Sequence, residues 1–171
     1  MSVEFSQKTL QEFEGLLDRS PTRKAASIPT LFLAQRDFGY ISNEVIEYVS
    51  GLLDLTVAET NNIVSFYSMF YREKMGKHVI QVCHTLSCSL LGAANIVDHL
   101  KSKLGISPGE TTLDNQFSLL KVECLGACGT APAMRINDDY YESLTLNKID
   151  ELIDKLAVKS VNHPSAEGPV Q

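Results

Sequence analysis

The chain of 171 residues carries a net charge of −6, and 44% of its residues are hydrophobic against 21% charged. This composition excludes a disordered tail and disfavours a general nucleic-acid binder, which neutralises phosphates with a surface rich in Lys and Arg. No run of residues approaches the roughly 20 apolar residues of a membrane span, and the N-terminus lacks the basic and apolar regions of a signal peptide. We therefore expect a cytoplasmic protein with no direct membrane insertion and no nucleic-acid partner.

Residues 1–75 are predicted to be almost wholly helical. The first helix has apolar residues at helical spacing, namely Leu10, Phe13, Leu16 and Leu17. Ser20-Pro21 is a start signal for a second helix, because a proline in the first turn loses no hydrogen bond. Pro29 then either kinks that second helix or restarts it after Ser27.

Two more helices are expected before residue 75. Ser42 is predicted to cap a helix whose apolar stripe is Val45, Ile46, Val49, Leu52 and Leu53. Thr56 and Glu59 form a capping box for another helix, whose apolar side carries Ile63, Phe66, Tyr67 and Phe70. We expect these aromatic residues to pack against other helices, and the alternative is a docking patch of Phe66, Tyr67, Phe70 and Tyr71. Four short amphipathic helices bury their stripes against one another, so this part is predicted to be a helical bundle.

From about Gly76 the pattern changes to strands that alternate with helices. Strands are predicted at residues 79–82 and 117–122, and a hairpin turned at 137–139 joins 133–136 to 140–141. Helices are predicted at 90–104, before Gly105, and at 146–156. This succession is typical of an α/β sandwich of thioredoxin type. The chain is thus predicted to be α+β, with a helical bundle (1–75), a thioredoxin-like domain (76–157) and a flexible tail (158–171).

All four cysteines lie in the second half of the chain, as two pairs. Cys83 and Cys88 are separated by four residues, Cys124 and Cys128 by three, and each pair begins where a predicted strand ends. Loops at the C-terminal ends of strands commonly carry the binding chemistry of α/β folds. Two such loops can bring four sulfurs to one point, where four thiolates suit a [2Fe–2S] cluster or a zinc ion.

The cysteine spacing favours the cluster over the zinc ion. Structural zinc sites more often have two-residue gaps, whereas a four-residue gap occurs in plant-type [2Fe–2S] proteins. The glycines beside Cys128 and the hydroxyl residues beside Cys88 let N–H and O–H groups approach the sulfurs. From the residues alone, zinc binding and a thiol–disulfide or merely buried role stay open as alternatives, although the C-x2-C of a redox motif is absent.

Several motifs together resemble one family. They are SFYSMF at 65–70, VCHTLSC at 82–88, VECLGAC at 122–128 and APAM at 131–134. From about residue 20 to 157 the chain resembles the family of the 24 kDa subunit of respiratory complex I (NADH:quinone oxidoreductase), a thioredoxin-like ferredoxin family. The resemblance implies a [2Fe–2S] cluster held by Cys83, Cys88, Cys124 and Cys128. It also places Ala131-Pro132 where such folds carry a cis-proline.

The resemblance implies a function as well. The chain would be an electron-transfer subunit of NADH:quinone oxidoreductase, and its cluster would exchange single electrons with the FMN of a partner flavoprotein subunit. FMN and NADH would bind that partner, because this chain has neither G-x-G-x-x-G after a strand nor a P-loop. The heterodimer would sit peripherally at the cytoplasmic face of the bacterial inner membrane through the larger complex. The alternatives are the equivalent subunit of an NAD-linked hydrogenase or formate dehydrogenase, or a structural Zn(Cys)4 module.

Overall fold

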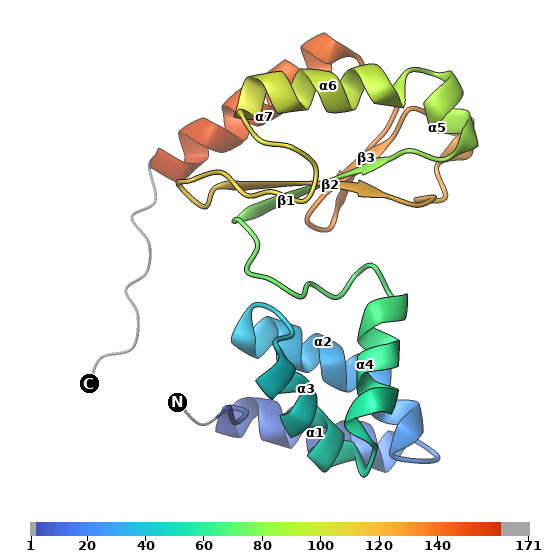
Figure 1. Cartoon of the computed structure of the whole chain (residues 1–171), viewed down its shortest axis with the longest axis vertical. Coiled ribbons are helices and arrows are strands. Elements are labelled where there is room, and N and C mark those ends of the chain that lie inside the picture. The colour runs from blue at the N-terminus through green and yellow to red at the C-terminus, as the bar shows by residue number, and fades with distance from the viewer. Residues whose placement is uncertain (1–2, 162–171) are drawn as a thin grey trace. The chain divides into compact units, whose positions relative to one another are not determined.

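The chain divides into two compact units, Met1–Met75 and Gly76–Gln171 (Figure 1). The computed structural model describes residues 3–161, with side chains for residues 3–157. The first unit is helical, and its elements are α1 (Gln7–Arg19), the 3-10 turn η1 (Lys24–Ala26), α2 (Ser27–Phe38), α3 (Asn43–Leu53) and α4 (Val57–Phe66). The second unit combines a sheet with helices.

Short polar side chains begin three helices of the first unit. The hydroxyls of Ser6, Ser42 and Thr56 accept hydrogen bonds from backbone N–H groups in the first turns of α1, α3 and α4, respectively. Each bond satisfies a donor that has no partner within its helix. The capping box of Thr56 and Glu59 is complete, since each side chain bonds the other residue's backbone N–H. The caps predicted at Ser42 and Thr56 are confirmed.

The start predicted for α2 at Ser20-Pro21 is wrong. Ser20 instead ends α1, and its N–H donates to the carbonyl of Leu17. Pro21 therefore acts as a helix terminator, a common position for proline just beyond a C-cap. α2 begins at Ser27, which agrees with the predicted alternative of a helix restarted near Pro29. Pro29 occupies the first turn of α2, where a missing N–H costs no intrahelical bond.

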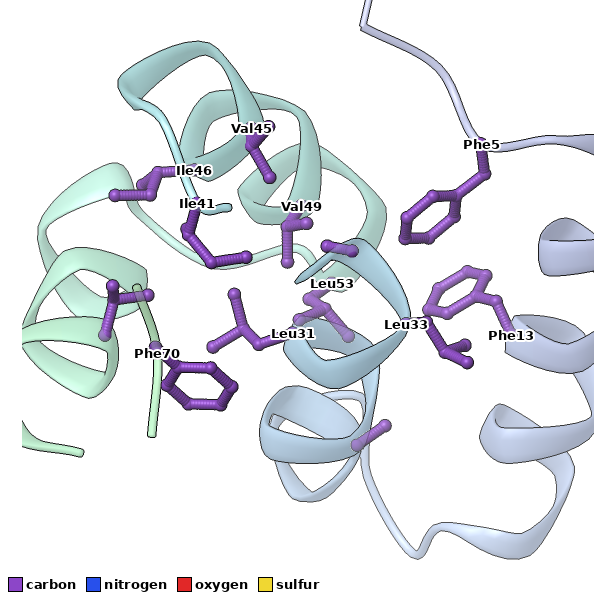
Figure 2. Packing of buried hydrophobic residues seen from close by; sticks show 13 residues of the cluster. Phe5, Phe13, Leu31, Leu33, Ile41, Val45, Ile46, Val49, Leu53 and Phe70 are labelled. Carbon is purple, nitrogen blue, oxygen red and sulfur yellow. The ribbon is translucent and has the colours of Figure 1, made fainter. Parts of the chain in front are cut away.

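One apolar core lies within the first unit, and Figure 2 shows its buried side chains. Leu31 of α2 and Val49 of α3 are fully buried in it, and Phe5 stacks on Phe38 at 5.7 Å between ring centroids. The apolar stripe predicted for α3 is buried at Val45, Ile46, Val49 and Leu53. This core joins helices that are far apart along the chain.

The apolar side predicted for α4 is only partly right. Phe66 is 80% exposed, whereas Phe70 is 5% exposed and packs at 5.2 Å from the ring of Phe32. The reason is that α4 ends at Phe66 and Tyr67 adopts an extended backbone. The helical period therefore stops, and Phe66 and Phe70 no longer share a face; Thr60 and Val64 are the buried residues of α4.

The second unit is built on a mixed sheet of four strands in the order β2-β1-β3-β4. The strands are β1 (His78–Cys83), β2 (Phe117–Val122), β3 (Met134–Ile136) and β4 (Asp139–Tyr141). β1 pairs parallel with β2 and antiparallel with β3, and β3 pairs antiparallel with β4. Helices are present at α5 (Leu86–Leu90), α6 (Ala93–Leu104) and α7 (Leu146–Val161), with a 3-10 turn η2 (Cys128–Thr130).

Alternate residues of the strands bury one face of this sheet. Ile80 and Val82 of β1 pack in a core with Leu100 of α6 and Ile149 of α7. Both helices accordingly lie on the same side of the sheet in Figure 1. The strands and the hairpin are confirmed, and the Ala131-Pro132 peptide bond is cis, at the position where the resemblance places a cis-proline.

Two boundaries differ from the prediction. The helix expected at 90–104 begins at Ala93 as α6, because Gly92 at φ +93° precedes it, and the short helix α5 before it was not predicted. α7 extends to Val161, so residues 158–161 of the predicted tail are helical, and its remainder lies outside the described residues. Among residues 3–161, no helix is long and apolar enough to cross a membrane.

Candidate metal centre

Two neighbouring strands carry both cysteine pairs to one edge of the sheet. β1 and β2 run parallel with Cys83 opposite Val122, and the N–H of His84 continues the ladder to the carbonyl of Val122 at 3.1 Å. Parallel neighbours end at the same edge of a sheet. The loop after Cys83 and the loop that begins at Glu123 therefore start side by side.

The first loop holds its two cysteines in an apolar surround. Cys83 and Cys88 are each 2% exposed and cluster with the small side chains of Ala93 and Ala133. The N–H of Cys83 donates to the carbonyl of Ala133 at 3.2 Å, and the short helix α5 returns the chain so that Cys88 lies near Cys83. Burial raises the pKa of the Cys88 thiol. Water has little access to this pair.

The second loop presents its two cysteines to solvent. Cys124 and Cys128 are exposed, and their Sγ atoms lie 3.6 Å apart. Gly126 has φ +80°, a conformation that side chains disfavour, and its N–H donates to the Cys124 sulfur at 3.4 Å. This hydrogen bond lowers the pKa of the Cys124 thiol, whereas the hydrogen bond with Cys124 raises the pKa of the Cys128 thiol.

Hydroxyl groups of the first loop lie close to sulfurs of both loops. The Thr85 hydroxyl lies 3.3 Å from the Cys83 sulfur. The Thr85 hydroxyl also contributes to the lowered pKa of the Cys124 thiol, and the Ser87 hydroxyl opposes the rise in the pKa of the Cys128 thiol. Burial raises the pKa of the Cys83 thiol, but hydrogen bonds from Thr85, the Leu125 backbone and Cys88 together outweigh burial, and the net pKa is lowered. The structure therefore places the four predicted site residues in two neighbouring loops, with Cys83 and Cys88 in one buried cluster and the sulfurs of Cys124 and Cys128 3.6 Å apart.

The residues fit a [2Fe–2S] cluster by the chemistry of their donors. The sulfurs occur as two pairs, one from each loop, and such a centre takes four cysteine thiolates. Small residues surround the buried pair and N–H and O–H donors reach the sulfurs. Over residues 3–161, no three His, Cys, Asp or Glu side chains are arranged to hold a single metal ion.

Two features beside the cysteines were not predicted from the sequence. His84 and Glu123, which adjoin Cys83 and Cys124 in the chain, pair across the strand ends at 3.5 Å between Nε2 and Oε1. α5 exposes the large side chains Leu86, Leu90 and Leu91. The position of His84 and Glu123 next to cysteines at paired strand ends is the signal that could have indicated the first of these features.

Comparison with known proteins identifies the family. Residues 13–157 match the family model described as thioredoxin-like [2Fe-2S] ferredoxin. An NADH-quinone oxidoreductase subunit of Rickettsia bellii is 43% identical over 155 residues, which cover 89% of this chain and 93% of the relative. The mitochondrial NADH dehydrogenase [ubiquinone] flavoprotein 2 of Dictyostelium discoideum is 43% identical over 169 residues, 97% of this chain and 67% of the relative. The chain belongs to the thioredoxin-like [2Fe–2S] ferredoxin family, and its cofactor is a [2Fe–2S] cluster.

A solved structure shares the fold. The air-oxidized NAD+-reducing [NiFe]-hydrogenase matches 84% of this chain with a TM-score of 0.68 and 24% sequence identity. This chain spans 24% of the length of that hydrogenase chain. At this identity the match shows the shared fold, and it confirms the predicted α+β class.

Proposed function

We propose that Cys83, Cys88, Cys124 and Cys128 hold the [2Fe–2S] cluster and that the chain carries single electrons as a subunit of an NADH-quinone oxidoreductase. The observation that carries this proposal is the placement of two cysteine pairs in adjacent loops at the ends of the parallel strands β1 and β2. The relatives named as subunits of this oxidoreductase support it.

The side chains around such a centre contribute to it in different ways. Cys83 and Cys88 supply thiolates from a nearly dry, apolar pocket, and Cys124 and Cys128 supply them from an exposed loop. When bound, the cluster supplies one-electron transfer at its irons. Gly126 N–H and the Thr85 hydroxyl stabilise negative charge on the sulfurs. The exposed second loop leaves this edge of the unit accessible to a redox partner.

The electron donor in this proposal is the FMN of a partner flavoprotein subunit that also binds NADH. The lack of a dinucleotide or phosphate-binding motif in this chain supports a separate nucleotide-binding subunit. We place the heterodimer at the cytoplasmic face of the inner membrane, held there by the larger complex. Within this assembly, residues 1–75 form the helical domain and residues 76–157 the cluster domain.

Metal analysis of anaerobically purified protein tests the ligand assignment. We expect two irons and two labile sulfides per chain, and one unpaired spin by EPR after dithionite reduction. Replacing any one of Cys83, Cys88, Cys124 or Cys128 by Ser should lower the iron content, because each substitution removes a thiolate. The exposed Ser89→Ala, next to Cys88, is the matched control and should keep full iron. One zinc per chain, or four Cys variants with the wild-type spectrum, would show that the assignment is wrong.

Native purification tests the partner and the parent complex. A tagged chain expressed in its own cell should co-purify with a protein that contains FMN and oxidises NADH. Quinone reduction by the purified assembly supports the oxidoreductase, whereas nickel in the assembly indicates an NAD-linked hydrogenase. Recovery of the iron-loaded chain without any flavin would contradict the proposed partner.

A further inference from the structure

Thr85 occupies the N-cap position of α5 without acting as a cap. An N-cap threonine ordinarily accepts a hydrogen bond from an N–H of the first helical turn, as Thr56 does at α4. The Thr85 side chain makes no such bond. Its backbone carbonyl accepts from the N–H of Ser89 at 2.8 Å, so the turn closes through the main chain. The hydroxyl of Thr85 is consequently available for another partner.

That partner is sulfur. The Thr85 Oγ1 lies 3.3 Å from the Sγ of Cys83 in its own loop, and the same hydroxyl contributes to the lowered pKa of the Cys124 thiol in the second loop. Thr85 is half-buried, which limits competition from water. A thiolate bound to metal has no proton to donate, so in the loaded protein the hydroxyl must be the donor. The hydroxyl of Thr85 is thus placed to donate to the sulfur of Cys83.

We propose that Thr85 is a positioning residue of the metal centre, whose hydroxyl donates a hydrogen bond to the Cys83 sulfur and raises the reduction potential of the bound cluster. Reduction adds negative charge that the sulfurs share. A hydrogen bond donated to a sulfur therefore stabilises the reduced form more than the oxidised form, and such bonds are among the determinants of cluster potential. This inference rests on the proposed ligation by the four cysteines.

Three variants of the full chain separate the hydroxyl from the shape of the side chain. Thr85→Val removes the hydroxyl and keeps a branched side chain of similar size. Thr85→Ser keeps the hydroxyl and removes the methyl group. Ser89→Ala, in the same short helix, removes an exposed hydroxyl and serves as the matched control. Each protein is purified anaerobically, its iron and sulfide are counted, and its midpoint potential is measured by an EPR-monitored redox titration.

We expect Thr85→Val to lower the midpoint potential while it keeps full iron. A tenfold decrease in the equilibrium constant for reduction corresponds to about 59 mV for a one-electron couple. Loss of a hydrogen bond to a charged group changes an equilibrium constant by a factor of this order. Thr85→Ser and Ser89→Ala should keep the wild-type potential. An exchangeable proton coupled to the reduced cluster, detected by pulsed EPR after transfer to D2O, should disappear in Thr85→Val and persist in Thr85→Ser.

The remaining outcomes separate the role of Thr85 from the assignment of the four cysteines. A Thr85→Val protein with full iron, an unchanged potential and an unchanged proton coupling would overturn the role of Thr85 and leave the cysteine assignment standing. A wild-type protein without iron and sulfide would instead contradict the proposed function. Thr85→Ala takes the place of Thr85→Val if the valine side chain prevents loading. Loss of the cluster in both, with a full cluster in Thr85→Ser, supports the proposal that the hydroxyl positions the Cys83 sulfur.

Discussion

Two glycines of this chain differ in whether their surroundings leave room for a side chain. A Cβ added at Gly76 would lie 2.9 Å from backbone atoms of Phe117, at the start of β2, and the N–H of Gly76 donates to the Ser118 hydroxyl at 2.7 Å. A Cβ added at Gly51, within α3, would meet no atom within 4 Å. The first position needs glycine for close backbone approach, and the second does not.

This difference predicts opposite changes in stability. Gly76→Ala should lower the free energy of unfolding by about 1–3 kcal/mol, because backbone atoms must shift to admit the methyl group. Gly51→Ala should raise it by about 0.5–1 kcal/mol, since alanine loses less conformational entropy in a helix. Urea unfolding of both variants, followed by circular dichroism, measures the two changes. A stable Gly76→Ala protein would show that β2 can move away from this residue.

At the scale of the element, one carboxylate connects a helix start with a distant turn. Glu59 completes the capping box of α4 with Thr56, and its Oε1 lies 2.9 Å from the Nζ of Lys24 in η1. The hydrogen bond from Lys24, followed by those from Thr56, lowers the pKa of the Glu59 carboxyl to about 2. The pair is partly exposed to solvent, so salt will weaken it.

The lowered pKa predicts how Glu59 contributes to stability as pH changes. A carboxylate whose pKa falls from 4.5 to about 2 on folding stabilises the fold fully above pH 4.5. This stabilisation is lost as the pH falls toward 2, where the group takes up a proton in both states. Glu59→Gln keeps a capping partner for Thr56 and removes the charge. Its difference in unfolding free energy from the wild type should be largest near pH 6 and vanish near pH 2.

Urea titrations of the two proteins between pH 6 and 2.5 check this dependence. Lys24→Gln is the companion variant, because it removes the charge from the other side of the same pair. A constant difference between wild type and Glu59→Gln over this range would mean that the ion pair contributes nothing and that only the capping bond matters.

At the scale of the whole molecule, each unit has an apolar core of its own. Leu31 is fully buried among residues of the first unit, and Leu100 is fully buried between α6 and the sheet of the second. The four cysteines belong to the second unit alone. The cluster should therefore depend on one core and not on the other.

Truncation of each core tests this separation. Leu31→Ala and Leu100→Ala should each cost about 2–5 kcal/mol of stability in their own unit. Leu100→Ala should lower the urea concentration at which the cluster absorbance is lost. Leu31→Ala should lower the urea concentration at which the helical circular dichroism signal is lost, and it should leave the EPR spectrum of the folded protein unchanged. Equal loss of the cluster in both variants would show that the two units unfold together.

Local signals predicted most of the elements. The caps at Ser42 and Thr56 and the end of α6 at Gly105 depend on residues within one turn, so the sequence alone sufficed. α5 was missed because five residues are too few to show a helical period. Phe66 was predicted to be buried because the apolar spacing of a helix continues to Phe70 in the sequence, whereas the helix ends at Phe66 and Tyr67 is extended.

The sequence by itself predicted the chemistry of the candidate site. Four cysteines at these gaps after two strand ends favoured thiolate ligation, because the proposed ligands lie within short loops whose spacing is read from the sequence. Only the tertiary structure decided which strands are neighbours, which pair is buried and where Thr85 directs its hydroxyl. These features depend on contacts between segments about 40 residues apart, such as Cys83 opposite Val122. Burial and strand order are set by packing of the whole unit, which no short stretch of sequence encodes.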